Sequence, residues 1–323
     1  MNLQEKVARF TLASLKGMTP TKFKAILEKT DNISEFCKQN SIRINQKDFE
    51  EAYQYSVYGE ETYPELLMKI ADPPAFIYII GELKKVPEKC VAIVGTRNIT
   101  NYGMRAAQEI TRDYVKLGYC IVSGLASGVD SIVHKTCLEA GGITIAVLGG
   151  NVNRAYPAVN YELYESIKKS GCIISEFNYN QGYAKYMFAR RNRIIAGLAQ
   201  KIIIIEAPEK SGAMITAKYA IDYDRELIAV PGSIYQKMSA GCNRLIFQNS
   251  AQIYFKQSRI ISAELTNEAD KLIYKTISEG SSSLDEILEK VYMSRPELIN
   301  RLMNLEMQEI IAKDLFDRYI VLS

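Results

Sequence analysis

Seven short apolar segments recur through the middle of this chain, and their regular spacing restricts the folds that it can adopt. From the third segment onward, each begins 24 to 30 residues after the one before. Amphipathic stretches with helical periodicity separate several of them, as at 104–117, 131–140 and 161–169. Buried strands alternating with helices are typical of a parallel sheet covered on both faces, and right-handed crossovers make such a sheet doubly wound. We therefore predict an α/β fold with a doubly wound, mostly parallel sheet built from residues 75–80, 91–95, 119–123, 143–148, 172–176, 202–206 and 227–230.

The segments on either side of this region have helical patterns of their own. In residues 1–65, apolar side chains follow helical spacing, and Thr19 before Pro20 is a typical helix start. The C-terminal segment shows three helical stretches and then a short hairpin-like pattern, which is the order of elements in a winged helix. We expect a small helical, SAM-like domain over 1–65, a Rossmann-like domain over 66–260 and a winged-helix domain over 264–323.

Positive charge is concentrated in the middle of the chain, although the whole protein carries only +3. Residues 1–70 are neutral, whereas residues 71–263 carry 23 basic against 15 acidic side chains, a net +8. This excess suits a polyanionic partner. Residues 264–323 carry seven basic against twelve acidic side chains, and this net −5 opposes duplex DNA binding, because phosphate neutralisation supplies most non-specific affinity.

The cysteines and the single histidine indicate which cellular compartment and which metal chemistry to expect. The six cysteines form no C-x-x-C pair and several lie in apolar segments, which favours a reduced, cytoplasmic protein. No apolar run approaches the ~18–20 residues of a membrane span, and Lys6, Arg9 and Lys16 interrupt the N-terminus, so we expect neither membrane insertion nor a secretory signal. The single histidine, His134, and the lack of an H-E-x-x-H motif predict no metal site.

Small and hydroxyl-bearing residues follow the predicted strands at the edge where a doubly wound sheet binds its ligands. Glycine lets the backbone approach a ligand closely, and Ser or Thr at a helix start places a hydroxyl beside free N–H groups. One such turn most often only reverses the chain, but four at one edge, at 95–97, 123–128, 211–216 and 231–233, predict a phosphate-binding cleft. Arg97 follows its strand directly, where it either clamps a phosphate or forms a structural salt bridge. The candidate ligand-binding residues in these turns are Gly95, Thr96, Arg97, Ser123, Gly124, Gly128, Ser211, Gly212 and Thr216.

The strongest positive cluster consists of Arg190, Arg191, Asn192 and Arg193. Cations close to aromatic rings suit single-stranded nucleic acid, whose phosphates need positive charge and whose unstacked bases need flat apolar surfaces. At an exposed helix start each cation opposes the helix dipole by about 0.3–1 kcal/mol, so three together predict an anion from outside. The alternative is a solvated helix start whose arginines pair with carboxylates. The aromatic residues that precede the cluster are Tyr183, Tyr186 and Phe188.

Two other polar positions have more than one interpretation. Asp130 and His134 are four residues apart on one helical face, where a buried histidine hydrogen-bonded near Asp130 is favoured over a metal or acid–base pair. Glu206 ends a strand, where it acts as a general base or, as we favour, caps a neighbouring helix or positions an arginine. Neither G-x-G-x-x-G after 91–95 nor G-x-x-x-x-G-K-[ST] occurs, so we predict no cofactor and no catalytic residues.

Ordered motifs through the middle of the chain resemble those of one known family. Together they are similar to the bacterial DNA-processing protein A (Smf) family over most of residues 66–255. The motifs include I-V-G-T-R at 93–97, S-G-L-A at 123–126, G-V-D at 128–130, Y-P at 156–157, R-R-N-R-I-I-A-G-L at 190–198 and G-C-N-R-L-I at 241–246.

The resemblance implies a non-enzymatic, Rossmann-like domain that binds single-stranded DNA, forms a homodimer and helps load the RecA recombinase during natural transformation. It places DNA phosphates near the turn at 95–97, with the other matching turns lining the same pocket. Ser127 stands where many relatives carry a basic residue, and Ala158 stands where some do. Arg190 and Arg191 are therefore expected to carry more of the binding here, and the apolar stretch 245–247 is a candidate dimer contact.

Two other functions stay open on the residues alone. A nucleotide hydrolase on a related sheet typically carries a P-G-G-x-G-T turn with nearby catalytic carboxylates, and this turn is absent from the sequence. A transcription regulator would read duplex DNA through the winged helix, which the acidic charge of 264–323 opposes. Nucleotide hydrolysis by the purified protein would favour the first function, and duplex binding stronger than single-strand binding would favour the second.

Overall fold

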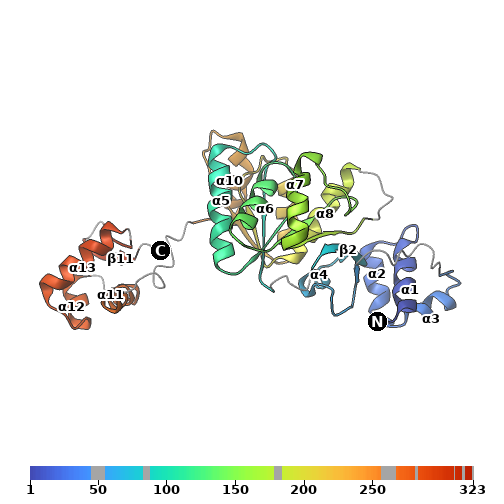
Figure 1. Ribbon diagram of the computed structural model, residues 1–323, viewed down its shortest axis with the longest axis horizontal. Helices are drawn as coiled ribbons and strands as arrows, with labels where there is room; N and C mark the ends of the chain where they lie inside the picture. Colours follow the sequence, from blue (N-terminus) through green and yellow to red (C-terminus); the bar gives the residue numbers. More distant parts are fainter. Residues whose placement is uncertain are drawn as a thin grey trace. The chain divides into compact units, whose positions relative to one another are not determined.

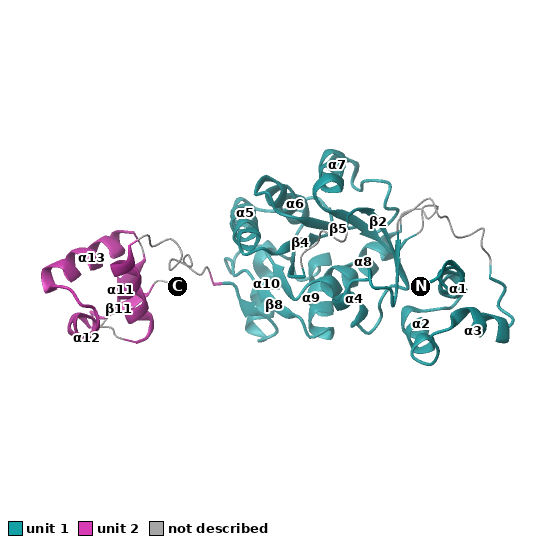
Figure 2. Cartoon of the chain, turned by 60° about the horizontal axis from the view of Figure 1, so that its bottom comes forward, with its two compact units in different colours: residues 1–254 teal, residues 255–323 magenta. Residues whose placement is uncertain are grey.

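The computed structural model describes residues 1–44, 55–82, 88–177, 184–255, 267–280, 283–308, 310–314 and 317–321. The chain divides into two compact units, residues 1–254 and 255–323 (Figure 1, Figure 2). The first unit takes in both the helical N-terminal segment and the α/β region, so the division into three domains stays a prediction.

A nine-stranded sheet lies at the centre of the described part of the first unit, in the order β1-β2-β6-β5-β4-β3-β7-β8-β9. Strands β3 to β9 pair in parallel, whereas β2 pairs antiparallel with both β6 and β1. This confirms the mostly parallel α/β fold, with segment 75–80 joining as an antiparallel strand. The strands are β1 (Tyr55–Val57), β2 (Phe76–Gly81), β3 (Cys90–Val94), β4 (Cys120–Ser123), β5 (Thr144–Val147), β6 (Cys172–Ser175), β7 (Lys201–Ile204), β8 (Glu226–Ala229) and β9 (Gln252–Ile253).

The winding of the sheet changes direction at β3. Strands β4, β5 and β6 follow on one side of β3, and β7, β8 and β9 follow on the other. In an open sheet of this kind the ligand crevice lies beyond the carboxyl ends of the strands at the point of reversal, here between β3 and β7.

Helices cover both faces of the sheet. On one face α5 (Asn101–Lys116), α6 (Val129–Glu139) and α7 (Tyr161–Ser170) lie side by side (Figure 1). The other face is covered by α4 (Glu65–Met68), α8 (Lys185–Leu198) and α9 (Gly212–Asp222), with α10 (Ala240–Phe247) packed near β8. Short 3-10 turns at Ala158–Asn160 and Lys237–Ser239 complete this part of the chain.

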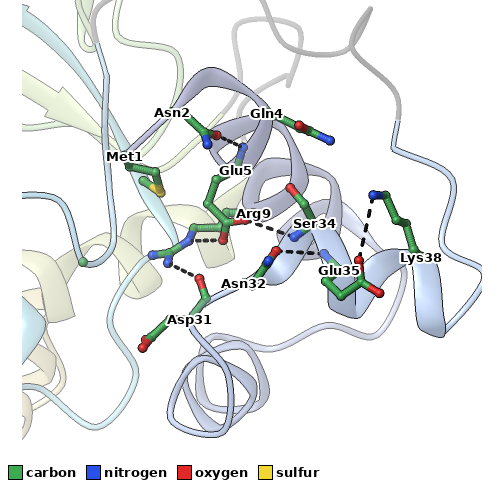
Figure 3. A pocket seen from close by; sticks show the side chains of 11 residues that line it. Met1, Asn2, Gln4, Glu5, Arg9, Asp31, Asn32, Ser34, Glu35 and Lys38 are labelled. Atoms are coloured by element: carbon green, nitrogen blue, oxygen red, sulfur yellow. Dashed lines mark hydrogen bonds and ion pairs between the residues drawn. The ribbon is translucent and has the colours of Figure 1, made fainter.

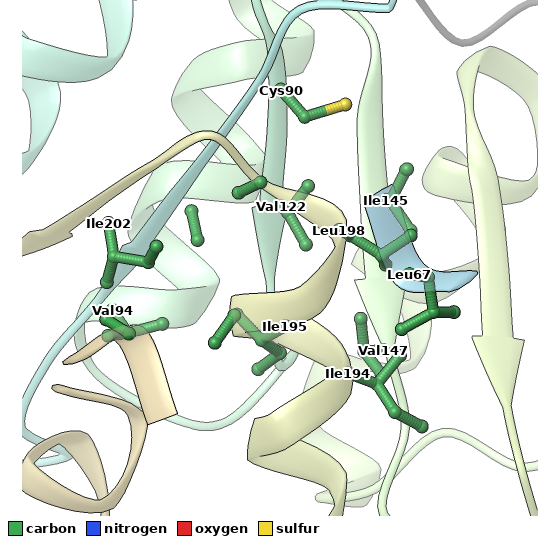
Figure 4. Close-up of a cluster of buried hydrophobic side chains, with 14 of the residues drawn as sticks. Leu67, Cys90, Val94, Val122, Ile145, Val147, Ile194, Ile195, Leu198 and Ile202 are labelled. Atoms are coloured by element: carbon green, nitrogen blue, oxygen red, sulfur yellow. The ribbon is translucent and has the colours of Figure 1, made fainter. Parts of the chain in front are cut away.

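The core is divided between the two faces by the two-residue period of the strands. In β3, Val91 and Ile93 pack toward α5 and α6, whereas Val94 belongs to the cluster that contains Ile194 and Ile195 of α8 (Figure 4). Because both faces are buried, the strands need apolar residues at every position. This explains why they appear as continuous apolar runs in the sequence.

The N-terminal segment forms three short helices, α1 (Leu3–Ser14), α2 (Pro20–Leu27) and α3 (Ile33–Gln39). Thr19 caps α2 as expected, because its hydroxyl accepts the Lys22 N–H at 3.2 Å. Val7 and Phe10 of α1 pack against Tyr78 of β2, so this helical segment is attached to the edge of the sheet through apolar contacts.

The second unit has its own apolar core, formed by residues such as Ile273, Leu298 and Tyr319. Its order of elements is three helices followed by an antiparallel strand pair, as the sequence predicted. The elements are α11 (Glu268–Ser278), α12 (Leu284–Lys290), α13 (Arg295–Met307), β10 (Ile311–Lys313) and β11 (Tyr319–Val321).

Candidate functional site

The carboxyl ends of the central strands open onto a pocket of about 420 Å³. The turn after β3, the start of α6, the first half of α8 and the first turn of α9 enclose it. The chain thus brings together three of the turns that the sequence singled out. Polar residues of its lining are Thr96, Arg97, Asp130, Lys185, Arg191, Asn192, Ser211 and Thr216.

Arg97 is an exposed cation at this pocket. Hydrogen bonds of the preceding residue, Thr96, fix the backbone of its turn. The Thr96 N–H donates to the Glu206 carbonyl at 2.7 Å, and the Thr96 carbonyl accepts the Val129 N–H at 3.1 Å. Within the described part of the chain, the Arg97 guanidinium takes part in no ion pair. The structural salt bridge considered for Arg97 is therefore not found there, and a fixed backbone presents a free guanidinium to the pocket.

Glu206 caps the helix that follows Arg97. Its carboxylate accepts the Thr100 N–H at 2.9 Å and the Thr100 hydroxyl at 2.6 Å. Thr100 is the N-cap of α5, so the favoured interpretation of Glu206 as a helix-capping residue is confirmed. With the side chain 2% exposed and both oxygens engaged, Glu206 has no position from which to act as a general base.

Two glycines allow the turns to close. Gly128 has a φ of +81°, and a Cβ there would meet the carbonyl oxygens of Thr96 and Arg97. A Cβ at Gly124 would enter the space of the Arg191 guanidinium, 2.5 Å from Cζ. Both glycines are therefore needed for close packing between turns. On the sequence alone they were selected as ligand-binding residues instead.

The arginine cluster differs from its predicted form. Helix α8 begins at Lys185, so the cluster lies in the middle of the helix and not at its start. Arg191 is 4% exposed, and its Nη1 donates to the carbonyl oxygens of Gly124 and Val147, both at 2.5 Å. Burial lowers the pKa of Arg191 to about 10, which leaves it charged at neutral pH. Internal carbonyl acceptors therefore occupy Nη1 of this residue.

Arg193 and Arg190 both pair with a carboxylate, which is the alternative that the sequence left open for this cluster. Arg193 is 1% exposed and donates to the Glu176 carboxylate and to the Asp72 carbonyl, the latter at 2.7 Å. Arg190 is partly exposed, 3.2 Å from the same Glu176 oxygen, with its guanidinium over the ring of Phe177. These contacts make Arg193 a structural residue, which corrects its selection as a nucleic-acid ligand. Tyr183 lies outside the described residues.

Asn192 joins the two helices that flank the pocket. Its Oδ1 accepts Arg191 Nε at 3.0 Å, and its Nδ2 donates to the Gly212 carbonyl at 3.0 Å at the start of α9. The neighbouring Ser211 hydroxyl is buried and has no hydrogen-bond partner in the described chain. Ser211, Gly212 and Thr216 all line the pocket, as the sequence suggested.

Ser123 and His134 point into the protein. The Ser123 hydroxyl donates to the Ile93 carbonyl at 2.7 Å and so ties β4 to β3, which corrects its selection as a ligand-facing residue. His134 is fully buried with Nδ1 2.7 Å from the Thr144 hydroxyl, and burial lowers its pKa to about 3. The favoured interpretation of a buried, hydrogen-bonded histidine is confirmed, and the partner of the ring is Thr144. Among the described residues, no group of three or more His, Cys, Asp or Glu is arranged to hold a metal ion.

A second cavity of about 90 Å³ adjoins the pocket and shares Arg97, Phe188 and Arg191 with it. The rings of Tyr156 and Phe188 lie 5.1 Å apart beside it. Ser127 also lines this cavity.

Lys185 was not selected from the sequence, and Tyr156 was connected with the pocket only through the family motif at 156–157. A signal for Lys185 was present, because 185, 188 and 192 follow helical spacing and share one face of α8. No periodicity relates Tyr156 to Phe188, since a loop carries Tyr156 to that residue, which is 32 positions later in the chain.

A separate pocket of about 520 Å³ lies beside α1 and α3 (Figure 3). There the Glu5 carboxylate accepts Arg9 Nε at 3.0 Å and the backbone N–H groups of Ile33 and Ser34 at 2.9 and 3.0 Å. Arg9 also donates to the Tyr58 carbonyl at 2.6 Å. This network joins α1 to the start of α3 and to the segment after β1, which is a structural role.

Comparison with known proteins identifies the family of the chain. The model of the family described as DNA recombination-mediator protein A matches residues 54–265. The chain belongs to this family. Its match to Protein Smf of Synechocystis sp. is 34% identical over 264 residues, covering 80% of this chain and 64% of the relative. The chain thus spans just under two thirds of that relative's length.

Two solved structures from the family align with most of their own length. DNA processing protein A of Streptococcus pneumoniae aligns with a TM-score of 0.68 and 28% identity, over 78% of this chain and 95% of that one. DNA processing protein A of Helicobacter pylori aligns with a TM-score of 0.58 and 32% identity, over 66% and 97%. The latter structure concerns the single-stranded DNA binding mode of the Helicobacter protein. No described helix of the present chain is both long and apolar enough to cross a bilayer.

Proposed function

We propose that this member of the recombination-mediator family binds single-stranded DNA at the carboxyl-end pocket and acts as a mediator, not as an enzyme. The observation that supports the proposal is that the exposed cations of the pocket have no ion pair among the described residues, whereas its buried cation is compensated. Arg97 and Lys185 are exposed there without an ion pair to any described residue, whereas the deeper Arg191 has internal acceptors and a nearby carboxylate. Uncompensated cations at a concave edge attract a phosphate backbone.

Three further features favour a single strand over a duplex. A pocket of about 420 Å³ admits an unstacked base or a phosphate group, but it is far too small for a double helix. The aromatic pair Tyr156 and Phe188 stands beside Arg97, and rings next to cations are typical of single-strand sites. The Helicobacter relative, whose structure addresses single-stranded DNA binding, aligns with 66% of this chain.

The decisive experiment measures binding of fluorescent oligothymidylate and of a duplex of equal length at several salt concentrations. We expect the single strand to bind more tightly and log affinity to fall linearly with log salt. Arg97→Ala should weaken binding and reduce the salt slope by about 0.7, the value for one phosphate contact on a single strand, without lowering thermal stability. Arg112→Ala, an exposed change further along α5, is the matched control. A salt slope near zero, or an Arg97→Ala variant that binds normally, would exclude the proposal.

A homodimer is the proposed assembly. In the described sheet β9 is an edge strand with both residues exposed, and the nearby Phe247 is 87% exposed. Edge strands and exposed large apolar side chains favour subunit contacts. Light scattering at micromolar concentration tests this proposal, and a monomer there would contradict it.

Loading of RecA in the cytoplasm is proposed on the family resemblance, and a reconstituted strand-exchange assay tests it.

The C-terminal unit receives a protein-contact role in this proposal. We assign the N-terminal helices to a SAM-like domain and the second unit to a winged-helix domain that does not bind DNA. In α13, Arg295 pairs with Asp285 at 3.2 Å, and Arg301 pairs with Asp270 at 2.9 Å and Glu297 at 3.2 Å. These carboxylates compensate the cations that a recognition helix would offer to phosphate. Removal of residues 255–323 should therefore leave single-strand affinity unchanged, and a large loss with folding intact would contradict the assignment.

A further inference from the structure

Two buried groups of opposite charge, Asp130 and Arg191, lie beneath the carboxyl-end pocket. Asp130 is 6% exposed and Arg191 is 4% exposed, and both line the pocket. Asp130 comes from the first turn of α6 and Arg191 from the middle of α8. Because these helices cover opposite faces of the sheet, the two charges approach each other only beyond the ends of the strands.

Arg191 ties together three elements around the pocket. Its Nη1 is shared by the carbonyls of Gly124, directly after β4, and of Val147, the last residue of β5. Its Nε donates to Asn192, which in turn donates to Gly212 at the start of α9. The guanidinium therefore sets the spacing between two strand ends and a helix start.

Asp130 holds the same turn from the other side. Its carboxylate accepts the Ala126 N–H at 3.4 Å, and its charge favours the ionised form of Arg191. Burial raises the pKa of Asp130, and the charge of Arg191 opposes this effect. The turn from 124 to 130 also contacts the Arg97 turn directly, because the Val129 N–H donates to the Thr96 carbonyl at 3.1 Å. A displaced Arg191 would thus move the turn against which Arg97 rests.

We propose that Arg191 is a positioning residue for Arg97, with Asp130 as its counter-charge, so that the pair shapes the pocket but adds no net charge to it. This inference rests on the proposed single-strand binding. It assigns the phosphate-neutralising role at this pocket to Arg97 and Lys185. The rival is that Arg191 itself contacts a phosphate through its remaining nitrogen atom.

The charge-balanced double variant Asp130→Asn with Arg191→Met separates these two roles in the full-length protein. It removes both buried charges together, and neutral replacements of a whole buried pair often leave the fold intact. We expect oligothymidylate affinity to fall about tenfold, because the strand ends lose their shared donor, while the salt slope stays that of the unmodified protein. A slope that falls as in Arg97→Ala would overturn the proposal, since Arg191 would then neutralise a phosphate. Unchanged affinity would also overturn it.

Removing the Asp130–Arg191 pair in a protein that already lacks Arg97 distinguishes a positioning role from a purely structural one. In an Arg97→Ala background, removal of the pair should cost little further affinity, because the residue that it positions is gone. Fully additive losses would contradict the positioning role.

The single variant Asp130→Asn decides the question if the double variant does not fold. The asparagine keeps an acceptor for Ala126 but leaves the Arg191 charge uncompensated. If Arg191 only positions Arg97, affinity should be retained and the salt slope should stay that of the unmodified protein, because no further phosphate is contacted. A steeper slope would overturn the proposal, since Arg191 would then neutralise a phosphate. A folded Asp130→Asn protein with weaker binding would overturn the proposal. Failure of the unmodified protein to bind oligothymidylate would instead exclude the proposed function itself, and the inference with it.

Discussion

The Glu206 carboxylate accepts both the N–H and the hydroxyl of Thr100, at 2.9 and 2.6 Å, and so ties the end of β7 to the start of α5. The carbonyl of the same Glu206 accepts the Thr96 N–H at 2.7 Å. One residue thus holds both ends of the turn that carries Arg97. The free cation of the pocket is fixed from the neighbouring strand, across the point where the winding of the sheet reverses.

Glu206→Gln should weaken both the fold and DNA binding. The amide replaces one acceptor oxygen with a donor that faces the Thr100 N–H or hydroxyl, and the lost charge-assisted hydrogen bond is worth about 1.5–3 kcal/mol. We expect a lower melting temperature together with weaker oligothymidylate binding. Glu209→Gln, an exposed carboxylate nearby, is the control and should change neither quantity. Normal binding by Glu206→Gln would mean that the Arg97 turn does not depend on this cap.

Gly128→Ala tests the close contact between the α6 turn and the Arg97 turn. The new Cβ would meet the Thr96 and Arg97 carbonyl oxygens at a residue with φ of +81°. We expect a loss of about 2 kcal/mol or more in the free energy of unfolding, and weaker DNA binding in the folded fraction. Gly118→Ala is the matched control, because Gly118 has a φ of +77° but no atom within 4 Å of the added Cβ. Equal losses in the two variants, measured by urea unfolding, would show that strain alone is responsible.

Neighbouring arginines in α8 should differ sharply in their effect on stability. Arg193→Met leaves the buried Glu176 without its innermost partner, and breaking a buried charge pair costs about 3–5 kcal/mol. Arg190→Met removes a cation that is 44% exposed, and such pairs contribute about 0–1 kcal/mol. Thermal unfolding of the two variants gives the comparison. Similar melting temperatures would contradict the structural role of Arg193.

His134 should make the fold sensitive to acid. Burial lowers its pKa to about 3, so the folded protein does not bind the proton that the unfolded chain binds below pH ~6.5. Stability due to this group is therefore present above pH ~6.5 and is lost as the pH falls, by about 2 kcal/mol at pH ~5. Unfolding free energies of the unmodified protein and of His134→Gln, measured from neutral to acidic pH, isolate this contribution. Parallel pH profiles would show that His134 is not buried in the neutral form.

Local pattern determined much of the architecture. Continuous apolar runs at regular spacing predicted the parallel strands, because a strand buried on both faces needs apolar side chains at each position. The position of the pocket followed as well, since the carboxyl ends of parallel strands meet at one edge. Gly95, Arg97, Ser211 and Thr216 were selected in this way, and all line the pocket.

The roles of the cations were decided only by tertiary structure. Arg191 meets Gly124 and Val147, which are 67 and 44 positions away in the chain, and Arg193 meets Asp72, 121 positions away. Helical periodicity gives the face of an arginine but not the carbonyls and carboxylates that other elements bring to that face. The three arginines at 190, 191 and 193 therefore look alike in the sequence, although Arg191 and Arg193 are satisfied in the interior. Arg97 is left free because nothing in the described chain folds an acidic partner against it, and that depends on the packing of distant elements.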